Sequence, residues 1–199
     1  MNITDICNLA LNHIGRERIA DLNEDTEPAR TCRMHYDLVR KTLLRDYTWS
    51  FARKHTKLAL LNVDTPGWAF TYSYPNDCVI ARKLYNEDES WVILEKNLPG
   101  NMDETLVNDN TKALVCNYAD ACLEYTYDVK DANLFPADFS QALSYYLAAA
   151  IAPALTGSDS KAAAMEQRAA SYLSHSRFTQ TVERNRVPEY PSKYYHARW

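Results

Sequence analysis

The stretch LLRDYTWSFARK, residues 43–54, marks the point at which the hydrophobic period of the chain changes. Before it, apolar residues recur every three or four positions, as on one face of a helix, and after it they recur every second position, as on one face of a strand. Trp49 and Phe51 lie two positions apart and are followed by Arg53 and Lys54. We expect both rings to pack in the core, each burying about 150–250 Å². The two cations are expected to face solvent or an interface.

Two helices are expected before this point. The first starts near Thr4 and ends before Gly15, a residue suited to a left-handed C-terminal cap. The second begins near Pro28, after an acidic linker. Its apolar stripe consists of Ala29, Cys32, Tyr36, Val39 and Leu43. The charged residues are expected to face away from that stripe: Arg30, Arg33, Asp37, Arg40 and Lys41.

Strands are expected in the middle of the chain. The segment WAFTYSY, residues 68–74, alternates large rings with small or polar residues, which is typical of a strand with one aromatic face. Further strands are expected at 57–63, 79–85, 91–95 and 123–129, with a turn at NLPGN, residues 97–101. These segments together predict a small sheet.

Helical periodicity returns after Pro136, and a last helix is expected to open at Ser158 or Ser160. The final residues contain two prolines and several aromatic rings, so an extended tail is expected there. The predicted fold class is therefore α+β, mainly α: an antiparallel helical bundle with a small β-subdomain inserted between helices two and three. The expected boundaries are 1–55 and 131–180 for the bundle helices, 56–130 for the β-subdomain and 181–199 for the tail.

Composition and charge exclude some of the functions that the chain could have. The 199 residues are 46% hydrophobic and 24% charged, which is ordinary for a globular domain. A net charge of −4 argues against a protein that wraps nucleic acid tightly, because such binding relies on basic surface. Neither a signal peptide nor a membrane-spanning segment is evident, so we expect the chain to be made in, and to stay in, a cytoplasm. Five cysteines without a C-x-x-C pair favour reduced, buried thiols.

Candidate sites for metal or covalent chemistry are weak. Cys32 and His35 lie three positions apart, and Cys7 and His13 lie on another helix, but this spacing is unlike that of structural zinc sites. A cysteine nucleophile with a histidine base is permitted by composition, yet no local motif surrounds any cysteine. The four glycines are isolated and form no phosphate-binding loop. We expect no cofactor, no metal and no enzymatic activity.

The linker LNEDTEPA contains three clustered carboxylates, Glu24, Asp25 and Glu27. A glycosidase needs two such groups about 5 to 9 Å apart, so a cell-wall hydrolase is the alternative function. A solvated connector is the more common role for a loop of this composition.

The C-terminal residues are rich in groups that anchor protein interfaces. Tyr, Trp and Arg are the usual anchors, and the tail contains Tyr190, Tyr194, Tyr195, Arg198 and Trp199. Rings that the chain does not bury expose apolar surface unless a partner covers it. We expect these residues, with Arg53 and Lys54, to contact a partner; the alternative is a tail folded back on its own domain.

The motifs, taken in order, resemble those of the head–tail adaptor family of short-tailed bacteriophages, whose members are called tail tubular protein A. The resemblance begins with ALNHIG at 10–15, followed by Ile19 and Leu22. A spaced set follows: Ala29, Cys32, Tyr36, Arg40, Leu43 and WSFA at 49–52. It continues with WAFTYSYPNDC at 68–78, with the TYDVKDANLFPADFSQAL region and with the alanine-rich helix that ends in ALTGSDS.

This resemblance implies a helical bundle with an inserted β-subdomain, present in twelve copies in a ring. The ring would dock under the portal protein, receive the tail nozzle, a protein similar to tail tubular protein B, and let genome DNA pass through its lumen. The implied location is the neck of the virion, after assembly in the cytoplasm of a bacterial host.

A tube through which DNA slides should not hold its phosphates, so a mildly negative lumen is expected. The candidate lumen residues are Glu24, Asp25, Glu27, Asp103, Glu104 and Asp109. A DNA-binding regulator is disfavoured by the charge balance.

Overall fold

The computed structural model describes residues 1–85, 90–95 and 112–184 and divides the chain into two compact units. The helical unit comprises Met1–Val39 and the described residues from Asp131 onward, and the β unit comprises Arg40–Lys130. The described α-helices are α1 (Ile3–His13), α2 (Glu27–Asp46), α3 (Ala137–Thr156) and α4 (Asp159–Arg184). The boundary between the units falls inside α2, whose last residues belong to the β unit.

The predicted fold class is wrong. Half of the described residues are helical and 21% lie in strands, and seven strands form two antiparallel sheets. A helical bundle with a small inserted subdomain does not describe this arrangement. Two strands escaped the sequence analysis because neither alternates: β1 (Arg53–Lys57) is polar throughout, and β6 (Lys112–Cys116) is a nearly continuous apolar run.

The helical unit begins with a capped helix. At its N-terminus, Asn2 Oδ1 accepts a hydrogen bond from the Asp5 amide, and Asp5 Oδ2 accepts one from the Asn2 amide. This reciprocal capping box satisfies two amides that would otherwise lack partners. The buried face of α1 consists of Ile6, Cys7, Ala10 and Leu11. The expected helix near Thr4 is thereby confirmed.

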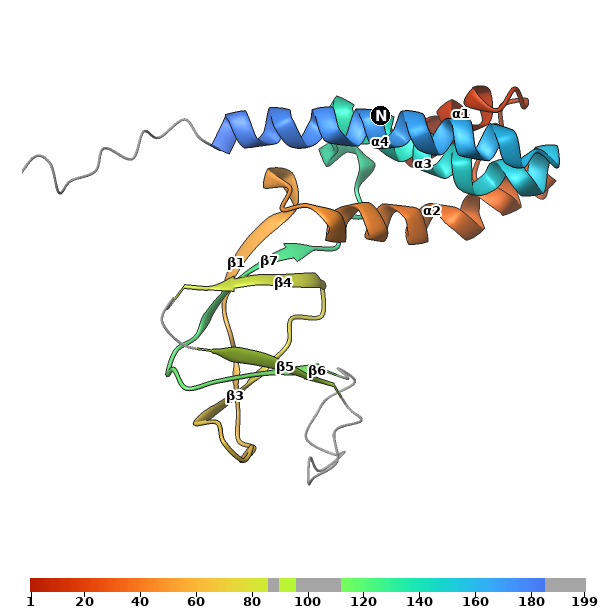
Figure 1. Cartoon of the computed structure of the whole chain (residues 1–199). Helices are drawn as coiled ribbons and strands as arrows, with labels where there is room; N and C mark the ends of the chain where they lie inside the picture. Colours follow the sequence, from red (N-terminus) through yellow and green to blue (C-terminus); the bar gives the residue numbers. More distant parts are fainter. Residues whose placement is uncertain (86–89, 96–111, 185–199) are drawn as a thin grey trace, which may run out of the picture. The chain divides into compact units, whose positions relative to one another are not determined.

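Helices α3 and α4 run side by side in opposite directions (Figure 1). Gly157 joins them at φ +63°, a left-handed conformation that glycine adopts without steric cost, and its amide donates to Pro153 O at 3.0 Å. The buried stripe of α4 contains Met165, Ala169 and Leu173. These contacts place the apolar faces of both helices in the core of the helical unit.

The β unit contains a three-stranded sheet in the order β1-β7-β4 and a four-stranded sheet in the order β2-β3-β6-β5. All neighbouring strands are antiparallel. Besides β1 and β6, the strands are β2 (Leu60–Leu61), β3 (Phe70–Ser73), β4 (Cys78–Leu84), β5 (Trp91–Glu95) and β7 (Cys122–Tyr127). The strand expected at 57–63 is therefore divided between the end of β1 and the short β2.

Residues from both sheets share one apolar core. Tyr72 on β3 and Leu114 on β6 pack in the same cluster as Leu84 on β4 and Leu123 on β7. The Tyr72 hydroxyl donates a hydrogen bond to Tyr118 O at 2.6 Å, which satisfies the polar end of a nearly buried ring. The prediction that the rings of segment 68–74 form one face is confirmed for Phe70 and Tyr72, which both pack against this core.

In and just after the last turns of α2, the burial of the rings agrees with the prediction, and the burial of one charged residue does not. Trp49 is fully buried, as expected, and Phe51 is half-buried. Arg40, however, was expected to face away from the apolar stripe, and its side chain is 1% exposed. It is buried because Asp128 and Val129 O supply partners for its guanidinium.

Candidate functional site

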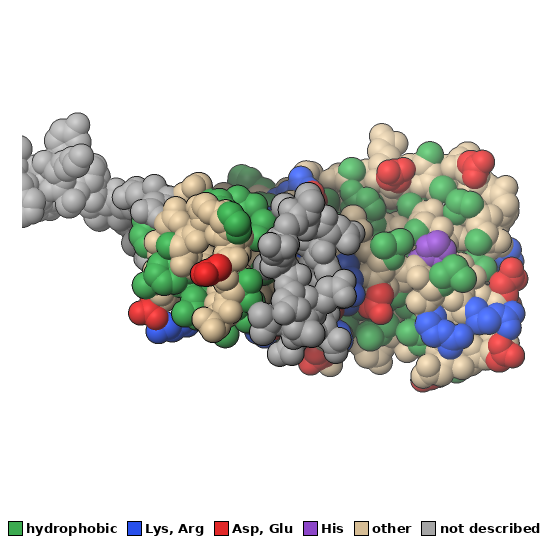
Figure 2. All heavy atoms as spheres, turned by 90° about the horizontal axis from the view of Figure 1, so that it is seen from below, with side chains coloured by type: hydrophobic (Ala, Val, Ile, Leu, Met, Phe, Trp, Pro, Cys, Tyr) green, Lys and Arg blue, Asp and Glu red, His purple; other side chains and the backbone are tan. Residues whose placement is uncertain are grey.

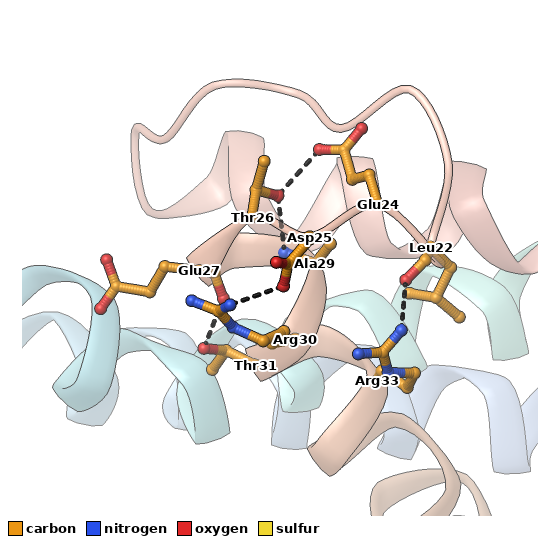
Figure 3. Close-up of polar contacts among 9 residues, drawn as sticks. All are labelled: Leu22, Glu24, Asp25, Thr26, Glu27, Ala29, Arg30, Thr31 and Arg33. Carbon is orange, nitrogen blue, oxygen red and sulfur yellow. Dashed lines mark hydrogen bonds and ion pairs between the residues drawn. The ribbon is translucent and has the colours of Figure 1, made fainter.

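The acidic loop before α2 is held together by its own side chains (Figure 3). The Glu24 carboxylate accepts hydrogen bonds from the Thr26 hydroxyl at 2.8 Å and from the amides of Ala20 and Asp21 at 3.0 and 3.4 Å. Thr26 Oγ1 in turn accepts a hydrogen bond from the Ala29 amide at 3.4 Å, a capping contact at the start of α2. Glu24 therefore shapes the loop that leads into the helix.

The other two carboxylates of the loop differ in their surroundings. Asp25 Oδ1 lies 2.6 Å from Arg30 Nη1, and the Asp25 side chain is 90% exposed. The Glu27 carboxylate points away from the other side chains drawn in Figure 3. Both side chains are exposed, and Glu27, the first residue of α2, is the one whose carboxylate lies apart from the other labelled side chains. Asp103, Glu104 and Asp109, the other predicted lumen residues, lie outside the described residues.

The electrostatics of Glu24 argue against its acting as the general acid of a hydrolase. The Thr26 hydroxyl, followed by the two backbone amides, lowers the pKa of Glu24, because each of these donors favours the ionised carboxylate. A glycosidase acid needs the opposite shift, since it must carry a proton near neutral pH. The hydrogen bonds of Glu24 therefore suit a loop-forming residue and oppose a role as general acid.

The two predicted interface cations lie on adjacent positions of β1. Lys54 Nζ is 2.6 Å from Asp77 Oδ2 and 4.1 Å from the centroid of the Tyr127 ring, so its charge is satisfied within the β unit. Arg53 Nη1 is 3.8 Å from Glu124 Oε1, a longer and weaker pairing. Of the two cations, Arg53 is the one whose geometry leaves more capacity for an external partner.

Asp77 links the turn before β4 to the other two strands of its sheet, β1 and β7. Besides Lys54, the Tyr125 hydroxyl donates a hydrogen bond to Asp77 Oδ1 at 2.9 Å, and Asp77 O accepts one from the Asp128 amide at 2.8 Å. Partial burial opposes ionisation, but the donors from Lys54 and Tyr125 outweigh it and lower the pKa of Asp77. In the sequence Asp77 is part of the motif WAFTYSYPNDC, and no pattern there predicts its role.

Arg82 is a second structural residue that the sequence analysis missed. From β4, its Nη2 donates to the carbonyl oxygens of Leu44, Arg45 and Tyr47 at 2.8–3.2 Å, and its Nε donates to Thr126 Oγ1 at 3.0 Å. Carbonyls at a helix C-terminus lack intrahelical donors, and a cation also favours the negative end of the helix dipole. Arg82 therefore fastens the end of α2 to the three-stranded sheet. No sequence pattern distinguishes it from a surface arginine.

An aromatic stack joins three helices of the helical unit. The His13 ring lies on Tyr145 at 3.9 Å between centroids, and Tyr145 lies on Tyr172 at 5.0 Å. His13 Nε2 is also 3.2 Å from Ser144 Oγ. Burial, followed by the charge of Arg168, lowers the pKa of His13. Ser144 is fully buried, so this Ser–His pair gives no substrate access to the hydroxyl.

The cysteine–histidine combinations do not converge on a metal site in the described part of the chain. Cys7 and Cys32 are both buried and contact each other across α1 and α2. The hydrogen bond to Cys32 and then burial raise the pKa of Cys7, so its thiol stays protonated. Among the residues that the structure describes, no three His, Cys, Asp or Glu side chains lie close enough to hold a metal ion.

A small open cavity of about 310 Å³ lies beside α1 in the helical unit. It is lined by Met1, Asp5, Asn8, Leu9, Asn12 and Arg18. Asn8 is already engaged, because its amide group exchanges two hydrogen bonds with the backbone of Ile19, at 2.8 and 3.0 Å. The polar groups at this cavity therefore hold the loop after α1.

Surface charge is mixed on the face drawn in Figure 2, where Lys and Arg side chains lie beside Asp and Glu and hydrophobic side chains reach the surface between them. Within residues 1–85, 90–95 and 112–184, no helix is long and apolar enough to cross a membrane. The predicted tail contacts at Tyr190, Tyr194, Tyr195, Arg198 and Trp199 lie outside the described residues.

Comparison with known proteins identifies no relative of this chain. No protein-family model matches the sequence, and no curated protein matches it.

Proposed function

We propose that the chain is a structural protein of a short-tailed bacteriophage virion, an adaptor between the portal and the tail nozzle. The observation that carries this proposal is the ordered set of motifs, which runs through both units of the chain. Three of the motif residues that the structure describes have structural roles. Trp49 is buried, Arg40 is buried in an ion pair, and Asp77 joins a turn to its sheet.

The proposed assembly is a ring of twelve copies, with the portal on one face, the nozzle on the other and double-stranded DNA passing through. Among the described lumen candidates we propose Glu27 first, because its exposed carboxylate lies apart from the contacts that Glu24 and Asp25 make. A negative charge there would repel passing phosphates. Arg53 is the described candidate for a partner contact, because its pairing with Glu124 is long. The ring would be assembled in the host cytoplasm and remain in the virion neck.

The test is electron microscopy of the purified chain mixed with the portal ring encoded by the same genome. We expect a second ring stacked on one end of the portal, with a copy number that can be counted in end views. A portal without added density contradicts the proposal. Release of soluble fragments from purified peptidoglycan would favour the hydrolase instead.

A pair of matched variants tests the interface residue. Arg53→Gln should reduce the fraction of portals that carry a second ring, whereas Lys130→Gln, at an exposed cation of the same unit, should leave it unchanged. Equal occupancy for both variants would remove Arg53 from the interface without affecting the adaptor proposal itself.

A further inference from the structure

One face of α2 exposes two large apolar side chains. Met34 is 75% exposed and Leu38 is 67% exposed. Residues four apart on a helix lie on the same face, so the two side chains are neighbours. Glu27 and Thr31 lie on the same line, at seven and three positions before Met34, and we call the set Glu27, Thr31, Met34 and Leu38 the α2 stripe.

This stripe lies on the side of α2 opposite its buried face. Ala29, Cys32 and Tyr36 are buried, and each is about half a helical turn away from the stripe. The folded helical unit therefore leaves Met34 and Leu38 at its surface. Together they form a small apolar surface that an aromatic segment can cover.

We infer that the C-terminal segment of the same chain, residues 185–199, docks on the α2 stripe in the free protein. The chemistry of the two partners is complementary. The segment contains the rings of Tyr190, Tyr194, Tyr195 and Trp199. Methionine makes favourable sulfur–aromatic contacts, and guanidinium groups stack on aromatic faces. Met34 lies on the stripe, and Arg30, four positions before Met34, borders it.

Charge complementarity supports the same pairing. The segment has three cations, Arg186, Lys193 and Arg198, against the single Glu189. At its N-terminal end the stripe has the exposed Glu27, and Asp25, which pairs with Arg30, is also exposed. The aromatic residues of the segment would cover Met34 and Leu38, while its cations lie near these carboxylates.

The length of the segment permits docking within one copy. Extended chain spans roughly 3.3 Å per residue, so residues 185–199 reach about 50 Å beyond the end of α4. Helix α4 has 26 residues and is about 39 Å long, so the segment can return along the whole helical unit. Tethering raises the effective concentration to the millimolar range, which favours the segment of the same copy over that of a second copy. This inference does not rest on the proposed adaptor function.

Photo-cross-linking of the full chain tests the inference. Met34 is replaced by p-benzoylphenylalanine, and the matched control has the same replacement at Gln167, an exposed position on α4. After irradiation of a dilute sample, we expect a monomer-sized product in which residue 34 is joined to peptides from 185–199. The yield of this cross-link should be several-fold higher from position 34 than from position 167. Dimer-sized product, joining to other regions, or equal yields from both positions would overturn the inference.

A second measurement uses limited trypsin digestion after Lys193. The double variant Met34→Gln/Leu38→Gln replaces exposed side chains without adding charge, so the fold and the charge of the stripe are retained. Cleavage should be faster by about tenfold or more, because the apolar contact is lost. The control Ala163→Gln/Ala164→Gln, also at exposed positions, should leave the rate unchanged. An unchanged rate in the stripe variant would contradict docking on α2.

Discussion

Arg40 Nη1 donates hydrogen bonds to Asp128 Oδ1 and to Val129 O, both at 2.6 Å, from a side chain that is 1% exposed. The pair joins the last turns of α2 to the residues that follow β7, 88 positions later in the chain. A buried guanidinium is stable only if its hydrogen bonds are satisfied, so these two acceptors hold the part of α2 that belongs to the β unit against the residues after β7.

Arg40→Leu should lower the free energy of unfolding by about 3 kcal/mol, because the substitution leaves the largely buried Asp128 carboxylate without its main partner. Lys41→Ala is the matched control: Lys41 lies 3.9 Å from the same carboxylate and is half-exposed, so its loss should cost less than about 1 kcal/mol. Urea denaturation followed by circular dichroism measures both. Equal effects would show that burial of Arg40 has no special importance.

Trp49→Ala should lower the free energy of unfolding by about 3–5 kcal/mol, because a fully buried indole leaves a large cavity. Trp49→Phe retains an aromatic ring but removes the hydrogen bond from Nε1 to Leu43 O at 2.8 Å. We expect this loss to lower the free energy of unfolding by at least about 1 kcal/mol. Phe51→Ala should cost less than Trp49→Ala, since Phe51 is half-buried. A Trp49→Ala chain with unchanged thermal unfolding would place the ring outside the core.

Arg82→Ala should destabilise the protein by about 3 kcal/mol, because three carbonyl oxygens near the end of α2 lose a charged donor. Arg45→Ala serves as the control, since the exposed Arg45 makes one 3.1 Å hydrogen bond to Val79 O. Hydrogen exchange of the last turn of α2 gives a local readout: protection should fall in Arg82→Ala and persist in Arg45→Ala.

Stability should fall as the pH decreases below 6.5, the ordinary pKa of histidine. Burial and Arg168 lower the pKa of His13 in the folded state, so the unfolded chain binds a proton first as the pH falls. The contribution of neutral His13 is complete above the unfolded pKa and is lost progressively down to the folded pKa. His13→Gln, which retains a polar group near Ser144, should flatten the dependence of the urea midpoint between pH 7.5 and 5.

His175→Gln is the control for this pH experiment, because it removes an exposed imidazole and leaves the His13 stack intact. If the urea midpoint of His13→Gln decreased with acid as steeply as that of the parent chain, another group would be responsible.

The sequence by itself determined the helices and most of the strands. Periods of 3.6 and 2 residues reflect which side chains must face the core, so α1, α3 and the expected segments at β3, β4, β5 and β7 could be predicted locally. Segments without alternation gave no such signal. The polar β1 and the apolar β6 were therefore missed, and with them the division of the strands into two sheets.

Only the tertiary structure decided which charged residues are structural. Arg40, Asp77 and Arg82 look like surface residues in the sequence, yet each is engaged by groups distant in the chain. Glu24, Asp25 and Glu27 all have a carboxylate, but their contacts differ. Glu24 accepts a hydrogen bond from Thr26, Asp25 pairs with Arg30, and the Glu27 carboxylate lies apart from both. Hydrophobic periodicity is a local property that one segment specifies, whereas the partner of a charge depends on long-range packing, and this is why the sequence determined the elements and the fold decided their contacts.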